Sequence, residues 1–380
     1  MTENGLNDYL FAAHRLEASD LHLTVGAPPS VRVSGRVRPL LSEGGAPCPP
    51  VSPSHARDVI YGILTDRQRK RLEEDLELDF SYTVANLSRF RVNVYVQRGS
   101  LGAAFRMIPH SITPLEDLGL PKVVADLADR PRGLVLVTGP TGSGKSTTLA
   151  AMIDRINEVR EEHIMSVEDP IEFLHFHKKC LVNQREVGQD TRSFANALKH
   201  VLRQDPDVIL VGEMRDLETI QLAITAAETG HMVFATLHTQ DAPQTVDRVI
   251  DVFPPHQQQQ VRTQLSNALE GVVTQTLVQR REERGGGRVV AAEVMVATSG
   301  VRNLIREGKN HQIYSAMQTG AGVGMVTMDA SLVDLVRRGE ISKESALKKS
   351  SNPEEVHRML GAGPPSARGG SRNGLVGGRR

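Results

Sequence analysis

The sequence contains two cysteines, Cys48 and Cys180, in 380 residues, and their spacing fits no metal-ligand motif. A disulfide framework and a four-thiolate zinc site are therefore both excluded, and a reducing compartment is expected. The sequence also lacks tryptophan and has only 4% aromatic residues. Because proteins that hold single-stranded nucleic acid stack its bases on aromatic side chains, this composition argues against nucleic acid as a partner.

The chain has no net charge, since 45 basic residues balance 45 acidic ones. Any polyanion would have to meet a local patch, because there is no overall excess of positive charge to attract it. No apolar run reaches the roughly 18 residues that a membrane span needs, and the first residues lack the pattern of a signal peptide. We expect a cytoplasmic protein with no transmembrane segment, at most peripheral on a membrane.

Length and patterning predict two globular domains. In residues 1–108, a helical period over residues 5–16 precedes segments that alternate apolar with polar residues, such as 21–25 and 89–96. These segments predict a small α+β domain with an antiparallel sheet. Residues 109–118 follow without a clear period and include Pro114, which is typical of an interdomain linker.

Residues 119–360 predict a larger α/β domain with a mostly parallel sheet. Short apolar runs, typical of strands covered on both faces, occur at residues 134–137, 163–167, 208–211 and 233–237. Helical periodicity over residues 257–279, and again beyond Gly300, predicts C-terminal helices. Residues 361–380 contain seven glycines, four arginines and no acid, so we expect a disordered tail.

A complete phosphate-binding loop follows the first of these strands. Residues 139–146 read Gly-Pro-Thr-Gly-Ser-Gly-Lys-Ser, which fits G-x-x-x-x-G-K-[ST] between a strand and a helical run. Backbone N–H groups at a helix amino terminus cradle the β-phosphate, Lys145 adds a positive charge, and the Ser146 hydroxyl enters the Mg²⁺ shell. ATP and Mg²⁺ are the expected cofactors, and the expected nucleotide-binding residues are Gly139, Pro140, Thr141, Gly142, Ser143, Gly144, Lys145, Ser146 and Thr147.

Carboxylates stand at the ends of two further strands. Glu213 ends an apolar strand, an arrangement that lets a phosphate-loop enzyme hold Mg²⁺ or its water. Glu168, Asp169 and Glu172 follow another strand and could orient or deprotonate the attacking water. The alternative for these acids is a helix cap and solvated surface residues. The residues alone do not rank Glu172 against Glu213 as the general base.

His238 ends a further strand, whose tip should reach the same carboxyl edge of the sheet. Ligands of open α/β folds bind at that edge. A neutral imidazole there would sense the γ-phosphate or anchor the water network, whereas a hydrogen-bonded structural histidine is the simpler alternative. The coincidence of His238 with the other strand-end motifs favours the functional role.

Taken together, these motifs resemble those of the secretion ATPases that drive type II secretion and type IV pili. The four segments that carry the resemblance are residues 139–148, 168–172, 205–216 and 230–239. The similarity is strongest to the pilus retraction ATPases and runs from about Leu6 to about Asn352. It includes residues 18–23, 89–93, 180–186 and 251–254.

The resemblance implies a RecA-like P-loop NTPase domain and a smaller PAS-like α+β N-terminal domain, assembled as a homohexameric ring. ATP would lie between the domains, near a subunit interface. Arg91 and Arg106 match family arginines that approach the phosphates when a ring interface closes, and ordinary solvent-facing arginines are the alternative. The implied roles of the other residues are phosphate binding by Lys145, Mg²⁺ binding by Ser146 and, partly through water, Glu213, general base catalysis by Glu172, and phosphate sensing by His238.

The function implied is a motor ATPase that powers type IV pilus retraction and twitching motility. Its partners would be the inner-membrane pilus platform protein and a paralogous retraction ATPase, and it would be cytoplasmic and peripheral at the inner membrane. Residues 300–308 resemble the short helix that distinguishes retraction motors. Helical periodicity places its side chains in two sets: Val301, Leu304 and Ile305 inward, and Arg302, Arg306 and Glu307 outward.

Three alternatives share some of these features. An accessory retraction paralogue would bind ATP in the same way, and only measured hydrolysis would distinguish it. An assembly or secretion ATPase of the same superfamily usually carries a four-cysteine zinc element, which two cysteines cannot form. A RecA-like nucleic-acid translocase should have a basic channel with stacking aromatic residues, and the composition argues against it.

Overall fold

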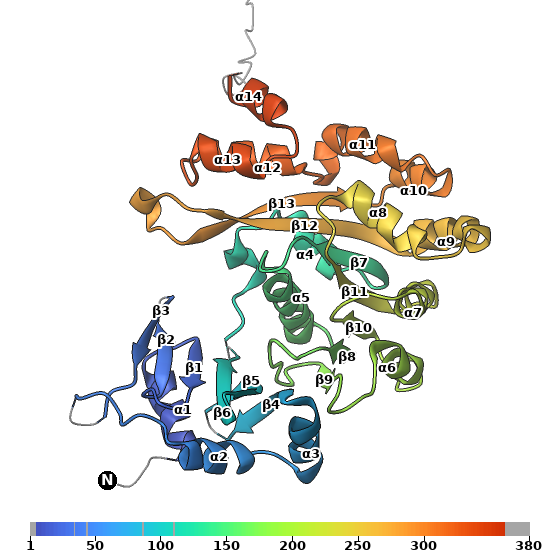
Figure 1. The fold of residues 1–380 in the computed structure, drawn as a ribbon. Helices are drawn as coiled ribbons and strands as arrows, with labels where there is room; N and C mark the ends of the chain where they lie inside the picture. The colour runs from blue at the N-terminus through green and yellow to red at the C-terminus, as the bar shows by residue number, and fades with distance from the viewer. Residues whose placement is uncertain (1–4, 34, 43–44, 86, 109–110, 362–380) are drawn as a thin grey trace, which may run out of the picture.

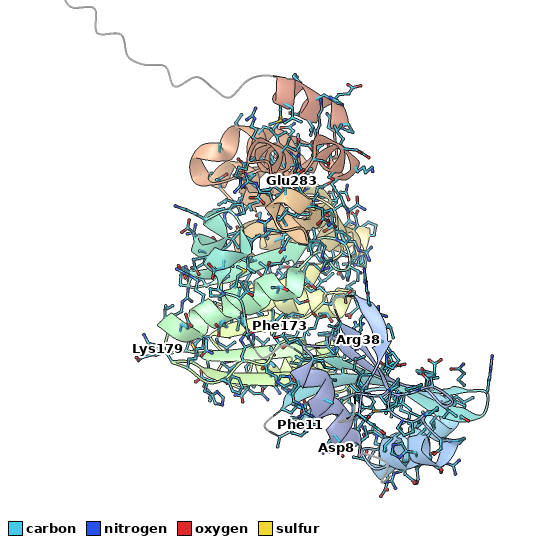
Figure 2. All side chains as sticks on the ribbon, turned by 90° about the vertical axis from the view of Figure 1, so that its left-hand side faces the viewer. Asp8, Phe11, Arg38, Phe173, Lys179 and Glu283 are labelled. Atoms are coloured by element: carbon cyan, nitrogen blue, oxygen red, sulfur yellow. The ribbon has the colours of Figure 1, made fainter. Side chains whose placement is uncertain are left out.

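The computed structural model describes residues 5–33, 35–42, 45–85, 87–108 and 111–361. The elements from α1 to β6, here called the small domain, lie beside one end of the larger domain that follows (Figure 1). In the orthogonal view of Figure 2, the small domain with Asp8, Phe11 and Arg38 lies at one end, and the C-terminal helices lie at the other. The predicted tail lies outside the described residues except for Gly361, which ends α14.

The small domain is built on a six-stranded antiparallel sheet in the order β3-β2-β1-β6-β5-β4. The predicted antiparallel α+β architecture is therefore confirmed, although the sequence pattern did not predict β3 or β6. Its elements are α1 (Leu6–Arg15), β1 (Asp20–Leu23), β2 (Ser30–Val33), β3 (Arg36–Pro39), α2 (Pro53–Tyr61), α3 (Asp66–Asp75), β4 (Glu77–Val84), β5 (Ser88–Gln97) and β6 (Ser100–Met107).

The large domain contains a seven-stranded sheet in the order β13-β12-β7-β11-β10-β8-β9. Its strands pair in parallel except for β12 and β13, which form an antiparallel hairpin. This arrangement confirms the predicted α/β class. The strands are β7 (Gly133–Thr138), β8 (His163–Glu168), β9 (Leu181–Glu186), β10 (Val208–Val211), β11 (Met232–Leu237), β12 (Leu269–Gln279) and β13 (Arg288–Val296).

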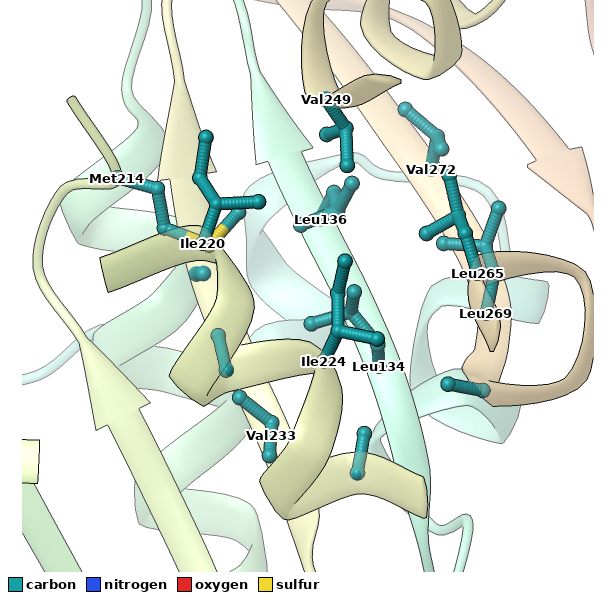
Figure 3. Packing of buried hydrophobic residues seen from close by; sticks show 14 of the residues in the cluster. Leu134, Leu136, Met214, Ile220, Ile224, Val233, Val249, Leu265, Leu269 and Val272 are labelled. Atoms are coloured by element: carbon teal, nitrogen blue, oxygen red, sulfur yellow. The ribbon is translucent and has the colours of Figure 1, made fainter. Parts of the chain in front are cut away.

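Helices cover both faces of this sheet. They are α4 (Val123–Ala128), α5 (Lys145–Val159), α6 (Phe194–Val201), α7 (Leu217–Glu228), α8 (Ala242–Asp251) and α9 (Pro255–Ala268), preceded by the short 3-10 helix η1 (Leu115–Leu118). Successive residues of β7 enter different cores: Leu134 and Leu136 pack with α7, whereas Val135 and Val137 pack with α5. Figure 3 shows Ile224 of α7 beside Leu134 of β7. The side chains of β7 from Leu134 to Val137 are therefore all apolar and fully buried.

The prediction of one helix over residues 257–279 was wrong beyond Ala268. There α9 ends, and Leu269 begins β12, which is buried on both faces over most of its length. The periodic residues Leu265, Leu269 and Val272 do share one apolar cluster, but only Leu265 lies on the helix. Residues 269–279 are rich in valine and threonine, whose branched Cβ atoms favour strands, and this preference prevails over the helical spacing.

In the described part of the chain, five α-helices follow β13: α10 (Ser299–Arg306), α11 (Ile313–Thr319), α12 (Met328–Arg337), α13 (Lys343–Lys349) and α14 (Pro353–Gly361). In α10, Val301 and Ile305 are fully buried, as predicted. The outward orientation predicted for Arg302 was wrong. Its guanidinium donates to the carbonyls of Ser266 and Asn267, at 3.0 and 2.7 Å, and pairs with Glu270 at 2.6 Å. Arg302 therefore fastens α10 to the last turn of α9.

A buried carboxylate joins the sheet to two helices. Glu293 of β13 accepts hydrogen bonds from the backbone N–H groups of Ala242 at 2.8 Å and Met328 at 3.2 Å. These residues begin α8 and α12, so one side chain caps two helix amino termini. Burial raises the pKa of Glu293 to about 7, although both hydrogen bonds act to lower it. The site therefore favours a protonated Glu293 in mildly acidic solution.

The two domains have separate hydrophobic cores. The small-domain cluster contains only residues from α1 to β6, and among the described residues the other clusters contain only residues of the large domain. Within the same described part of the chain, none of the helices is long and apolar enough to cross a lipid bilayer. Polar contacts must therefore contribute to holding the two domains in their relative orientation.

The raised pKa of Glu293 predicts a pH-dependent stability. In the folded chain the pKa of Glu293 is about 7, which exceeds its ordinary value of 4.5. The protonated side chain therefore contributes fully to stability below about pH 4.5, and this contribution is lost as pH rises through about 7. The loss should be on the order of 2–3 kcal/mol between about pH 5 and pH 8. Urea unfolding of a Glu293→Gln variant should show a smaller decrease across this range. Glu283→Gln, an exposed change on the β12–β13 hairpin, should follow the parent protein, and equal slopes in all three proteins would contradict the prediction.

Candidate nucleotide site

The phosphate-binding loop connects β7 to the start of α5, where Lys145 is the first helical residue. Its backbone requires glycine at Gly139, which has a φ of +132°. A Cβ atom on Gly139 would lie 2.2 Å from the carbonyl oxygen of Gln275 in β12, which is closer than any real contact. The loop therefore passes against β12 with no room for a side chain. This contact sets where the loop's N–H groups can gather in front of α5.

The Lys145 side chain folds back onto the backbone of the phosphate-binding loop. Its Nζ donates to the carbonyl oxygens of Gly139 at 2.9 Å and Pro140 at 3.1 Å, and it lies 3.4 Å from His238 Nδ1. Burial lowers the pKa of Lys145, while the charges of Glu213 and Glu172 partly offset that effect. A phosphate that reaches this ammonium group therefore exchanges two neutral carbonyl partners for charged oxygens, which make stronger hydrogen bonds.

Glu213 lies two residues beyond the end of β10, between the side chains of Arg215 and His238. Its Oε1 is 2.7 Å from Arg215 Nε and 3.0 Å from His238 Nε2. Burial raises the pKa of Glu213, but the hydrogen bonds and charges of Arg215 and His238 outweigh it and leave the pKa below its ordinary value. Glu213 is thus an ionised carboxylate near neutral pH, as a metal ligand should be.

The acidic residues Glu168 and Glu172, at and after the end of β8, have different surroundings. Glu168 is buried and accepts hydrogen bonds from Ser166 Oγ at 2.6 Å and Gln184 Nε2 at 3.1 Å. Burial raises its pKa despite these hydrogen bonds, so Glu168 belongs to the interior. Glu172, four residues later, is exposed and faces the loop.

One cavity of about 410 Å³ brings the predicted residues together. It is lined by the phosphate-binding loop, the start of α5, the acidic segment and the ends of β10 and β11. Its lining residues that the sequence singled out are Thr141, Gly142, Gly144, Lys145, Ser146, Thr147, Glu168, Asp169, Glu172, Glu213 and His238. Four segments that are distant in the sequence therefore meet at the carboxyl edge of the sheet, where ligands of such folds bind.

The two predicted arginines lie elsewhere within this chain. Arg106 donates through Nε to Asp20 Oδ1 at 3.0 Å on the small-domain sheet. Arg91 lines a cleft between the domains that also contains Asp169 and Pro170. Neither arginine lines the nucleotide cavity. Their contact with phosphates stays a prediction about a neighbouring subunit.

Sequence reasoning missed several residues that line the cavity, including His175, Phe194, Leu277 and Arg288. Burial lowers the pKa of His175 to about 4, so its ring is neutral near pH 7. Leu277 lies on β12, which the sequence pattern placed in a helix, and Arg288 begins β13, for which the sequence analysis predicted no element. A signal for Arg288 was present in the three glycines at 285–287, which mark a turn directly before it.

Comparisons with known proteins identify the family of this chain. The family model described as type II/IV secretion system protein matches residues 70–347. The chain belongs to this family. It is 55% identical to the type IV pilus retraction ATPase PilT of Pseudomonas aeruginosa over 337 residues, which covers 89% of this chain and 95% of that protein. It is 42% identical to the type IV pilus ATPase PilU of the same organism, over 92% of this chain and 89% of that one.

Two solved structures have the same fold as this chain. A crystal structure of the pilus retraction motor PilT with bound ADP is 47% identical, with a TM-score of 0.86 over 94% of this chain and 100% of that one. The ATPase DotB of Legionella pneumophila is 27% identical, with a TM-score of 0.73 over 91% of this chain and 96% of that one. The resemblance to retraction ATPases is thereby confirmed, and the family member with bound ADP supports nucleotide binding.

The contact between Gly139 and β12 predicts that the two loop glycines tolerate alanine unequally. Gly139→Ala must displace the loop from Gln275, whereas a Cβ on Gly142, whose φ is +76°, meets nothing within 4 Å. We expect Gly139→Ala to weaken the binding of a fluorescent ADP analogue about ten-fold or more, and Gly142→Ala to weaken it less. Titrations of both variants measure this difference. Equal affinities would show that the close approach does not shape the loop.

Proposed function

We propose that this chain is a motor ATPase that hydrolyses ATP to power type IV pilus retraction and twitching motility. The observation that carries the proposal is the convergence of the phosphate-binding loop, Glu172, Glu213 and His238 on one cavity. The 55% identity to a retraction ATPase, over nearly the whole of both chains, supports the direction of the motor. The 42% identity to PilU makes an accessory retraction subunit the second candidate.

The chain offers oxygen ligands suited to Mg²⁺. The Ser146 hydroxyl and the Glu213 carboxylate would hold the ion, the latter partly through water, and hard oxygen donors of this kind are what Mg²⁺ prefers. Mg²⁺ held there would supply positive charge that offsets the negative charge of the phosphates. The loop amides and Lys145 bind the same phosphates from the other side, and His238 links the γ-phosphate region to Glu213.

Glu172 is the better candidate for the general base. A carboxylate with a lowered pKa, such as Glu213, is a weak base, and Glu213 is already paired with Arg215 and His238. Glu172 lines the cavity and is exposed, which leaves it able to accept a proton from the attacking water. Glu213 then serves the metal and its water.

The working form in this proposal is a homohexameric ring. Residues 1–108 act as a PAS-like moving domain, 109–118 as the linker and 119–360 as the RecA-like ATPase domain. Because Arg91 and Arg106 do not line the cavity within one chain, we propose that they reach the phosphates of a neighbouring subunit, as arginine fingers do in other phosphate-loop enzymes. Loss of the γ-phosphate would release that interface and rotate one domain against the other.

The motor would act in the cytoplasm, peripheral at the inner membrane, on the pilus platform protein. A paralogous retraction ATPase is a further partner in this proposal. Nucleic acid has no place in it, because the chain has no net charge, no tryptophan and few aromatic residues. Nucleic acid should accordingly leave ATP turnover unchanged.

Removing the loop lysine tests the proposed activity and its biological role together. Lys145→Ala takes away a charge placed for the transferring phosphoryl group, so ATP hydrolysis should fall by about a hundred-fold or more. A strain that carries this variant should lose twitching and display excess surface pili. Lys122→Ala, an exposed change outside the loop, should behave as the parent chain. Bald cells would point to pilus assembly, and undiminished hydrolysis by Lys145→Ala would refute the site.

The two carboxylates should differ in how they affect catalysis. Glu172→Gln should lower kcat about a hundred-fold or more and leave the Mg²⁺ concentration for half-maximal rate nearly unchanged, because it removes only the base. Glu213→Gln should raise that Mg²⁺ concentration several-fold, because it removes a charge from the metal site. Magnesium titrations of ATP turnover measure both effects. The reverse pattern would exchange the two assignments.

A further inference from the structure

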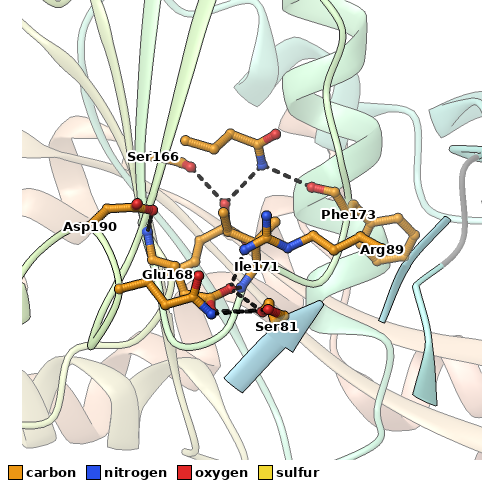
Figure 4. Close-up of polar contacts among 10 residues, drawn as sticks. Ser81, Arg89, Ser166, Glu168, Ile171, Phe173 and Asp190 are labelled. Atoms are coloured by element: carbon orange, nitrogen blue, oxygen red, sulfur yellow. Dashed lines mark hydrogen bonds and ion pairs between the residues drawn. The ribbon is translucent and has the colours of Figure 1, made fainter. Parts of the chain in front are cut away.

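Glu186 is a buried carboxylate of the large domain that is bound by the small domain. It ends β9, and its side chain is only 4% exposed. Ser81 of β4 donates to both carboxylate oxygens, at 2.7 and 2.8 Å, and Arg89 of β5 donates to Oε2 at 3.0 Å. Gln189 adds a longer contact of 3.4 Å to the Ser81 carbonyl. Hydrogen bonds between the domains therefore gather around this one carboxylate (Figure 4).

The same carboxylate also holds the backbone of the acidic segment. The Ile171 N–H donates to Glu186 Oε2 at 3.1 Å, and Ile171 itself is buried. Ile171 directly precedes Glu172 in the chain. We call Ser81, Arg89, Ile171 and Glu186 the latch. Through the latch, two strands of the small domain and the peptide next to Glu172 share one acceptor.

The large-domain side of the latch is rigid. The backbone N–H of Glu186 donates to Asp190 Oδ2 at 2.8 Å, and its carbonyl accepts from the N–H groups of Asp190 and Thr191 at 2.9 and 3.2 Å. Glu186 also lies opposite Glu168 in the ladder between β8 and β9. A shift of the small domain must therefore move the side chain or break charged hydrogen bonds, and a buried carboxylate that loses its partners is strongly disfavoured.

Little apolar packing competes with the latch for control of the domain orientation. The clusters of buried apolar residues stay within one domain in the described part of the chain. A cleft of about 320 Å³ between the domains, which contains Arg91 and Asp169, adjoins Glu186. The small domain thus contacts the acidic segment through charged and polar groups, which can exchange partners more readily than a packed core.

We propose that Glu186 is a positioning residue that transmits the orientation of the small domain to Glu172. When Ser81 and Arg89 hold the carboxylate, the Ile171 N–H is held, and with it the backbone from which Glu172 reaches the cavity. This inference rests on the proposed function, in which Glu172 prepares the attacking water. Ser81 and Arg89 of the small domain, neither of which lines the nucleotide cavity, thereby influence the rate of hydrolysis.

The latch should affect turnover more than nucleotide binding. The phosphates meet the loop after β7, and none of the four latch residues lines that cavity. Loss of Ser81 or Arg89 should therefore lower kcat and leave KM for ATP and the affinity for ADP within about two-fold. Loss of a residue that merely supported the fold would lower kcat and weaken nucleotide binding together.

The test uses the full-length protein and the variants Ser81→Ala and Arg89→Gln. We expect kcat to fall at least about three-fold in each, and Arg89→Lys, which keeps a cationic donor, to recover part of the loss. Arg36→Gln, an exposed arginine on the edge strand β3 of the same sheet, is the matched control and should keep the parent kcat. Fluorescent-ADP titration confirms that each variant still binds nucleotide.

Amide hydrogen exchange gives a readout that does not depend on activity. The Ile171 N–H should exchange faster in both latch variants than in the parent chain and in Arg36→Gln. A kcat change below three-fold, a rise in kcat, or unchanged exchange at Ile171 would each overturn the proposal. Undiminished hydrolysis by Lys145→Ala would instead overturn the proposed function, while exchange at Ile171 would still test the physical link.

Discussion

The parallel alignment of β7, β8, β10 and β11 is the constraint on which the nucleotide site depends. Their register brings Val167, Val211 and Ala235 side by side, and β7 ends level with β11 at Thr138 and Leu237. Because both faces of these strands are covered by helices, polar chemistry can lie only where the strands stop. The loop and the acidic segment begin within a few residues of those ends, and Glu213 and His238 lie equally close to them. Segments far apart in the sequence therefore reach one cavity.

The glutamates in and near this site have the same side chain but different surroundings, which give them different properties. Glu168 is buried beside neutral donors, and its pKa rises. Glu213 is bound by a guanidinium and an imidazole, and its pKa falls. Glu186 forms a buried ion pair with Arg89 across the domain boundary, and Glu172 is left open to solvent. In the proposed mechanism, one residue type would thus supply an interior hydrogen-bonding group, a metal ligand, a link between the domains and a base.

Sequence patterns were most successful where the physical signal is local. The phosphate-binding loop is contiguous, and Glu213 lies two residues beyond the end of its strand, so both could be predicted, and both contribute residues to the cavity. The strand β12 could not, because Leu265, Leu269 and Val272 fit a helical period even though only the first lies on a helix. The contacts of Arg302 and of Glu186 join residues separated by about 35 and 100 positions, and no periodicity reports on such pairs.

The separate cores of the two domains have a consequence for how the chain melts. Cooperative unfolding requires that the loss of one apolar cluster expose or disrupt another, and in the described residues the clusters of the two domains share no member. Heating or denaturant should therefore remove the two domains in distinct transitions, and no single midpoint describes the whole chain. A substitution in the small domain can melt that half alone, so that hydrolysis is lost although the nucleotide cavity keeps its structure.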